Sequence, residues 1–233
     1  MHDDLVRLRQ MDTHDRNAAR ASKAARALRD DRRGREKALA DAEAHLAQVE
    51  EDAQSLRKTE LTAHRDLERA RTYQTRARRA LEEGLGDAEA AQRQLEQTTV
   101  QIDDLETQLL EHMESGDAMT EKRASAATAI DSAKAHLAEL LERFDGELAA
   151  HLAEEAQQAA EVRSIAPLLP PELKGRYEDL RAKRQWAVAI VREGACNACN
   201  KVITQQHISD IRRGLLKACM GCHRFLVIPE SAD

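Results

Sequence analysis

The sequence Glu83-Gly84-Leu85-Gly86-Asp87 interrupts an otherwise continuous helical stretch and decides how the chain folds. Gly84 and Gly86 are the only close pair of glycines in residues 1–166, and aspartate is a residue type that caps the N-terminus of a new helix. Because this segment lies halfway along residues 1–166, a reversal here lets the two arms cover each other. The segment therefore predicts a helical hairpin with its turn near residues 84–87.

Both arms carry a seven-residue pattern of apolar positions, and no proline occurs before Pro167. The predicted seam of the first arm includes Leu39, Leu46, Ala63, Leu67, Ala70 and Ala77, and that of the second arm includes Leu95, Ile102, Leu109, Arg123, Ile130, Ala133 and Leu140. If residues i and j face each other with i + j near 172, large side chains meet small ones, as Ile102 does with Ala70. We therefore predict a mainly α fold built on a long antiparallel coiled coil. The alternative is a parallel dimer of one uninterrupted helix.

The composition supports long helices and argues against a conventional globular core, because charged residues make up 33% of the chain and aromatic residues only 2%. No apolar run approaches the ~20 residues that cross a bilayer, so we expect no membrane contact. The start Met1-His2-Asp3-Asp4 lacks the features of a signal peptide, which predicts a cytoplasmic protein. The net charge of −6 argues against a chain built throughout for nucleic acid.

The segment around Pro167 predicts a boundary between the coiled coil, residues 1–166, and a C-terminal domain, residues 167–233. A short helix is expected at roughly 171–184, with Pro171 in its first turn, followed by the β-prone run 186–191. Three of the five aromatic residues, Tyr177, Trp186 and Phe225, lie in this part, so a compact core is expected here.

Four cysteines in the C-terminal domain have the spacing of a zinc site. Cys196 and Cys199 form one Cys-x-x-Cys pair, and Cys219 and Cys222 form a second pair after nineteen intervening residues. Two such pairs each supply two sulfurs from one tight turn, which suits the tetrahedral coordination of zinc. The pattern therefore predicts a small zinc ribbon that binds one structural Zn²⁺ through these four residues.

Other chemistries for the four cysteines fit less well. A redox Cys-x-x-Cys motif needs a βαβ setting, a catalytic zinc keeps an open position, and an iron–sulfur cluster usually has other spacings. His207 and His223 are further candidate ligands, although surface or packing roles are favoured for both. His223 and Asn200 follow the second cysteine of each pair, where a left-handed backbone is often needed and where Asn and His are tolerated.

The chain from Leu169 to Pro229 carries a Leu-Pro-Pro-Glu-Leu helix, an apolar strand and the two Cys-x-x-Cys pairs, with Ile208, Ile211 and Gly214 between the pairs. This order resembles the bacterial C4-type zinc-ribbon proteins with an N-terminal coiled-coil hairpin. The opening Leu5-x-x-Leu8-x-x-x-Asp12 is also similar to that family. His223 departs from the family, which usually has glycine there.

The resemblance implies a non-enzymatic adaptor with a protein partner in the transcription or secretion machinery. Family members are linked to flagellar or type III secretion regulation through an alternative sigma factor and, in one branch, flagellin mRNA. The sequence leaves the oligomeric state open between monomer and dimer.

The alternative function is RNA or DNA binding by a regulatory protein through basic residues of the ribbon. Residues 167–233 hold 11 Lys and Arg against 7 Asp and Glu, a mild positive bias. The candidate phosphate contacts are Lys201, Arg212, Arg213, Lys217 and Arg224.

Overall fold

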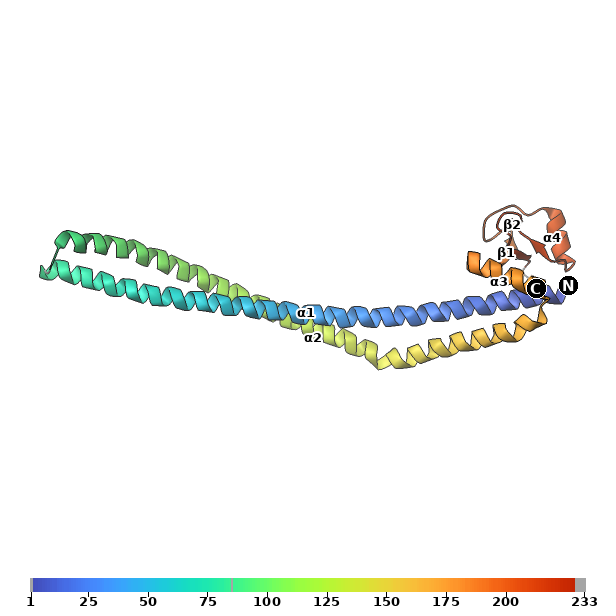
Figure 1. The fold of residues 1–233 in the computed structure, drawn as a ribbon, viewed down its shortest axis with the longest axis horizontal. Helices are drawn as coiled ribbons and strands as arrows, with labels where there is room; N and C mark the ends of the chain where they lie inside the picture. The colour runs from blue at the N-terminus through green and yellow to red at the C-terminus, as the bar shows by residue number, and fades with distance from the viewer. Residues whose placement is uncertain (1, 85, 229–233) are drawn as a thin grey trace. The chain divides into compact units, whose positions relative to one another are not determined.

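The structure is a computed structural model that describes residues 2–84 and 86–228. Two long helices, α1 (His2–Glu83) and α2 (Ala88–Ile165), account for most of the chain (Figure 1). Gly84 and Gly86 have φ values of +69° and +79°, which glycine adopts at little cost. The Asp87 carboxylate accepts hydrogen bonds from the Glu89 and Ala90 N–H groups at 2.9 and 3.3 Å, so it caps α2 as predicted.

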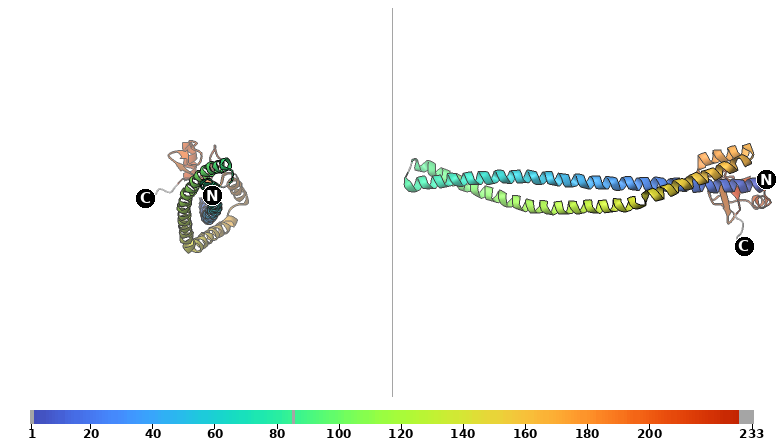
Figure 2. Two further views of the ribbon diagram at one scale, coloured as in Figure 1. Left: turned by 90° about the vertical axis from the view of Figure 1, so that its left-hand side faces the viewer. Right: turned by 90° about the horizontal axis from the view of Figure 1, so that it is seen from below.

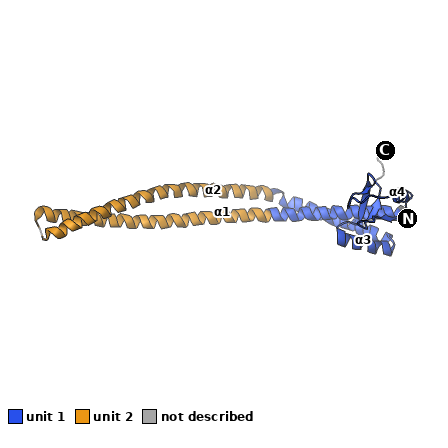
Figure 3. Ribbon diagram, turned by 90° about the horizontal axis from the view of Figure 1, so that it is seen from above, with its two compact units in different colours: residues 1–31, 141–233 blue, residues 32–140 orange. Residues whose placement is uncertain are grey.

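The contacts group the chain into two units (Figure 3). One unit contains the residues up to Asp31 together with those from Leu141 onward, and the other is Arg32–Leu140. Both long helices therefore contribute to both units. The predicted domain boundary at residue 166 lies at the end of α2, whereas the two units divide the chain at other residues. The domain boundary therefore stays a prediction.

Within the Arg32–Leu140 unit the two long helices run alongside each other in the side-on views (Figure 1 and the right panel of Figure 2). Its buried cluster contains Ala63, Leu67, Ala70, Ile102 and Leu109. Cross-helix contacts join Gln74 to Thr99 at 3.1 Å and Arg123 to Glu50 at 3.0 Å, and both pairs of residue numbers sum to 173. The antiparallel hairpin is therefore confirmed.

Arg123 differs from its predicted place on the seam. Its side chain is 63% exposed and its guanidinium pairs with Glu50. The physical reason is the cost of burying an unpaired charge between two apolar helices, which the long side chain avoids by reaching outward.

In the other unit, α2 is followed by a 3-10 turn (Ala166–Leu168) and by α3 (Pro171–Arg184), which begins at the predicted proline. The remaining elements are β1 (Val188–Arg192), β2 (Ala195–Cys196), α4 (Gln205–Arg212), β3 (Lys217–Ala218) and β4 (Phe225–Val227). The strands form one sheet in the order β2-β1-β4-β3. β1 pairs parallel with β4, with Val188 opposite Phe225, and the outer pairs are antiparallel.

The core of this unit is shared between the sheet and the first turns of α1. Leu5, Leu8 and Met11 of α1 belong to the same buried cluster as Tyr177 of α3 and Phe225 of β4. Strands of two to five residues bury little apolar surface alone, so the start of α1 supplies part of the core that the small sheet needs. Among the described residues, no helix is long and apolar enough to span a bilayer.

The seam makes a direct prediction about stability. Ile102 is 8% exposed and lies in the cluster with Ala70, so Ile102→Ala is expected to lower the free energy of unfolding by about 2–4 kcal/mol through lost burial and a cavity. Val100→Ala, on a side chain that is 62% exposed, is the matched control and should change it by less than about 0.5 kcal/mol. Chemical denaturation followed by circular dichroism measures both, and equal effects would contradict the register.

Candidate metal centre

The first cysteine pair forms a tight turn between β2 and the following loop. The Asn200 N–H donates to the Cys196 carbonyl at 2.8 Å, and the Cys196 N–H donates to the Lys201 carbonyl at 2.9 Å. Asn200 has a φ of +58°, the left-handed conformation predicted from its position. These bonds close the turn and turn the sulfurs of Cys196 and Cys199 toward one point.

The second pair repeats this arrangement. The His223 N–H donates to the Cys219 carbonyl and the Cys219 N–H donates to the Arg224 carbonyl, both at 2.9 Å. His223 has a φ of +62°, again as predicted. The two knuckles therefore have the same backbone structure, with Lys201 and Arg224 at equivalent positions.

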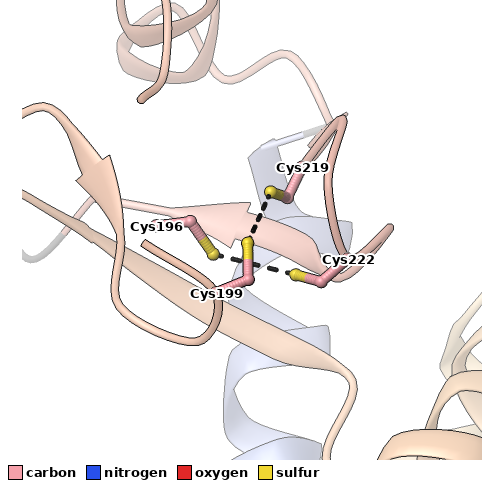
Figure 4. A group of neighbouring side chains, drawn as sticks. All are labelled: Cys196, Cys199, Cys219 and Cys222. Atoms are coloured by element: carbon pink, nitrogen blue, oxygen red, sulfur yellow. Dashed lines mark hydrogen bonds between the residues drawn. The ribbon is translucent and has the colours of Figure 1, made fainter. Parts of the chain in front are cut away.

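The four sulfurs converge between the knuckles (Figure 4), and all lie within 4.8 Å of one another. The Sγ atoms of Cys196 and Cys222 are 3.8 Å apart, and those of Cys199 and Cys219 are 3.5 Å apart. A tetrahedral ion with metal–sulfur bonds of about 2.3 Å separates its sulfurs by about 3.8 Å. These distances are far longer than the ~2.05 Å of a disulfide. The cluster therefore has the dimensions of a four-sulfur metal site.

Gly221 lies where the two knuckles approach each other closely, which favours a residue without a side chain. A Cβ atom at this position would lie 3.3 Å from both the Cys199 Sγ and the Lys201 Cβ. The sequence pattern does not single out this glycine, because only the packing of one knuckle against the other shows the close approach.

The surroundings of the sulfurs differ in exposure and electrostatics. Cys196, Cys219 and Cys222 are buried, whereas Cys199 is exposed. In the metal-free protein, burial raises the pKa of the Cys196 thiol to about 12. Burial also acts to raise the pKa at Cys222, but hydrogen bonds from the Arg224 backbone and side chain, together with those from Cys199 and Cys196, outweigh it and bring the pKa to about 7. Arg224 therefore favours one thiolate in the cluster.

The two histidines stand apart from the sulfur cluster, which alone among the described residues has the spacing of a metal site. The His207 ring lies 2.8 Å from the Thr204 hydroxyl, and the Thr204 side chain accepts from the His207 N–H at the start of α4. His223 is exposed beside its knuckle.

The basic residues proposed as nucleic-acid contacts have different environments. Arg224 is buried, and its guanidinium donates to the carbonyls of Trp186 and Arg184 at 3.1 and 2.9 Å. Lys217 and Arg213 both form ion pairs with Asp210, at 2.9 and 3.1 Å. Lys201 and Arg212 are exposed. Of the five side chains, Lys201 and Arg212 are therefore the two that are exposed and form no ion pair with another residue that the structure describes.

A buried polar contact joins α1 to the start of the sheet. The Asp12 carboxylate accepts from the Ala187 and Val188 N–H groups at 2.8 and 3.1 Å. The same carboxylate pairs with Arg16 at 2.6 Å, and Arg16 donates to the Val188 carbonyl at 2.7 Å. Asp12 thus satisfies two backbone donors that the sheet leaves unpaired, which fixes β1 on α1.

A second contact of this kind joins α1 to α3. The Tyr177 hydroxyl donates to the buried Asp15 carboxylate at 2.5 Å, and Arg181 pairs with Asp15 at 2.8 Å. Burial raises the pKa of Asp15 above its usual value, although Tyr177 and Arg181 act to lower it. Spacing within α1 does not show what a distant helix brings to it, so this pair could not be predicted from the sequence.

With this geometry established, comparison with known proteins places the chain in a family. Residues 5–185 match the model of the CT398-like coiled coil hairpin domain. The chain belongs to this family of coiled-coil hairpin proteins. No curated protein matches the sequence.

Solved structures show the same fold. CT398 from Chlamydia trachomatis is similar with a TM-score of 0.77 at 16% identity, over 98% of both chains. The HP0958 protein from Helicobacter pylori is similar with a TM-score of 0.70 at 12% identity, also over 98% of both chains. A protein from Mycobacterium smegmatis has a TM-score of 0.61 at 19% identity, over 96% of this chain and 98% of its own. At these identities the likeness concerns the fold.

The Asp12 contact generates a prediction for the attachment of the sheet. Asp12→Ala leaves two buried N–H groups without an acceptor and removes the ion pair with Arg16, so it is expected to lower the free energy of unfolding by about 2–4 kcal/mol. Trp186, the only tryptophan, adjoins these donors and reports the transition by fluorescence. Asp12→Asn keeps an acceptor oxygen and is expected to lose less. Equal losses for the two variants would contradict this role of the carboxylate.

Proposed function

We propose that Cys196, Cys199, Cys219 and Cys222 hold one structural zinc ion. The observation that carries the proposal is the convergence of four thiol sulfurs at separations that suit tetrahedral zinc. Bound zinc would join the two knuckles and contribute folding energy, which for small zinc fingers is roughly 10–16 kcal/mol. We place the protein in the cytoplasm, where thiols stay reduced and available to a metal.

We further propose that the protein is a non-enzymatic adaptor that binds a protein partner. Four sulfur ligands fill the coordination shell of zinc, so the ion would have no open position for a substrate. Its role would then be to hold the shape of the ribbon. The family resemblance supports a partner in the transcription or secretion machinery.

The ribbon has two exposed apolar side chains that such a partner could contact. Val202 is 76% exposed and Met220 is 74% exposed. Val202 follows Lys201 and Met220 precedes Gly221, and Lys201 and Gly221 are the two residues at which the knuckles approach each other. Methionine adapts its shape to different partners, and exposed apolar side chains near a rigid backbone favour binding. We therefore expect the partner to contact the knuckles, with the coiled coil providing a second surface.

Zinc binding can be tested by metal analysis of the purified full chain. We expect one Zn²⁺ per chain in the wild type and less in Cys219→Ser, because a serine hydroxyl is a poor substitute for a thiolate ligand. Removal of the metal by a chelator should unfold the ribbon and change Trp186 fluorescence. Zinc affinity should fall as the pH is lowered, because each ligand thiol must lose its proton to bind.

The matched control for this experiment is His223→Gly. It keeps all four sulfurs and relieves a left-handed backbone that histidine adopts at a cost, so zinc content should stay at one per chain. Wild-type protein without stoichiometric zinc, or a ribbon that stays folded after chelation, would contradict the proposal.

The adaptor role can be tested by capture of partners from cell lysate with the full chain as bait. The double variant Val202→Asp/Met220→Asp should lose ribbon-dependent partners by about tenfold or more while keeping its zinc, because it charges the proposed contact. Val100→Asp, on an exposed apolar residue of α2, is the control. An unchanged set of partners in the double variant and in Cys219→Ser would contradict a ribbon-centred adaptor.

Nucleic-acid binding by the ribbon stays a prediction of the sequence. Its exposed candidates without an ion pair to another described residue are Lys201 and Arg212. RNA recovered in the same capture experiment would favour it if Lys201→Ala/Arg212→Ala removed that RNA.

A further inference from the structure

The Arg32–Leu140 unit exposes three large apolar side chains at one height along the hairpin. Leu61 on α1 is 57% exposed, and Leu110 and Met113 on α2 are 63% and 61% exposed. In the register described above, Leu61 lies at the height of residue 111, between Leu110 and Met113. We call the surface formed by these three residues and the charged residues beside them the mid-arm face.

The three apolar residues lie on the same side of the coiled coil. Arg71 of α1 and Glu106 of α2 form an ion pair across that side at 2.9 Å. Leu110 and Met113 follow Glu106 by four and seven residues, which places them on its side of α2. Leu61 comes four residues after Arg57. Arg57 lies two heptads before Arg71, so both arginines and Leu61 are on the same side of α1. The mid-arm face is therefore a continuous surface made by both helices.

The two helices carry opposite charge along this surface. Residues 57–79 of α1 contain eight Lys and Arg against three Asp and Glu, whereas residues 94–121 of α2 contain eight acidic residues and no Lys or Arg. Six exposed charged side chains near the apolar centre have no ion-pair partner in the part of the chain that the structure describes: Arg57, Lys58, Arg65, Asp103, Glu114 and Asp117. The hairpin thus leaves a basic edge on α1 and an acidic edge on α2.

We propose that two copies of this chain associate through their mid-arm faces as a parallel dimer, independently of the metal. Closed dimers are usually two-fold symmetric. When two hairpins stack face to face, the two-fold axis can run parallel to the length of the hairpin or perpendicular to it. An axis along the hairpin places α1 of one copy over α2 of the other. Rotation about this axis keeps each residue at the same position along the length of the hairpin. Residue i of α1 therefore meets the partner's residue near 172 − i on α2.

This arrangement matches the unpaired charges. Lys58 lies at the height of Glu114 of the partner subunit. Arg57, at the height of residue 115, lies two residues from Asp117 of the partner subunit. Leu61 meets Leu110 and Met113 of the partner subunit at the centre. Two-fold symmetry repeats each pairing, so the dimer buries six apolar side chains between two sets of opposite charges.

Charge rules out the other stacking. An axis across the hairpin would place α1 on α1 and α2 on α2, which brings the basic edges together and the acidic edges together. Like charges facing each other across an interface are unfavourable. The charges of the mid-arm face therefore favour a second copy of this chain as the partner and favour its parallel orientation.

Sedimentation of the full zinc-bound chain over a range of concentrations tests the proposal. We expect a reversible dimer that weakens as salt is raised. Leu110→Glu/Met113→Glu should weaken dimerisation about tenfold or more, whereas Tyr73→Glu, on the opposite side of α1, should not. Lys58→Glu should also weaken it, and Lys58→Glu/Glu114→Lys should restore it by reversing the pair. Circular dichroism checks that each variant keeps its helices.

Crosslinking tests the direction of the partner. A chain with Leu61→Cys is mixed with a chain with Leu110→Cys, and zinc is kept in excess so that the native cysteines stay bound. The parallel dimer predicts a crosslink between the two different chains. Crosslinks within each population alone would overturn the parallel arrangement, and a chain that stays monomeric at high concentration would overturn the dimer.

Discussion

The convergence of four cysteine sulfurs is the constraint on which the C-terminal part of the chain depends. Each knuckle is closed by two backbone hydrogen bonds and by one left-handed residue, Asn200 or His223, and each knuckle follows a strand of only two residues. Such short strands cannot keep their pairing by burial alone. A metal bound by the four sulfurs would therefore stabilise the pairing of these strands, and the sheet in turn would position the sulfurs.

The ribbon also depends on the start of the long hairpin. Leu8 and Met11 are fully buried in its core, and Asp12 and Asp15 bind the backbone of β1 and the side chains of α3. These four residues lie within two turns of α1, far in sequence from the sheet that they support. The family match, which covers residues 5–185 and stops before the cysteines, includes this whole supporting surface. A partner bound to the ribbon would therefore act on a surface that the hairpin holds in place.

The sequence predicted the features that depend on local patterns. Heptad spacing and the glycine pair gave the hairpin and its register, Pro171 gave the start of α3, and cysteine spacing gave the sulfur cluster. The features that it missed depend on contacts between distant segments. The role of Asp12 depends on the two N–H groups that the sheet places beside it, and the burial of Arg224 depends on Trp186 and Arg184, whose carbonyls bind its guanidinium.

Zinc X-ray absorption of the purified full chain tests the central claim most directly, because it reports the ligands of the metal themselves. We expect four sulfur neighbours at about 2.3 Å and no nitrogen or oxygen in the first coordination shell. A shell with a nitrogen or oxygen ligand would mean that a histidine or solvent replaces a cysteine, and the closed structural site argued from the four sulfurs would be wrong.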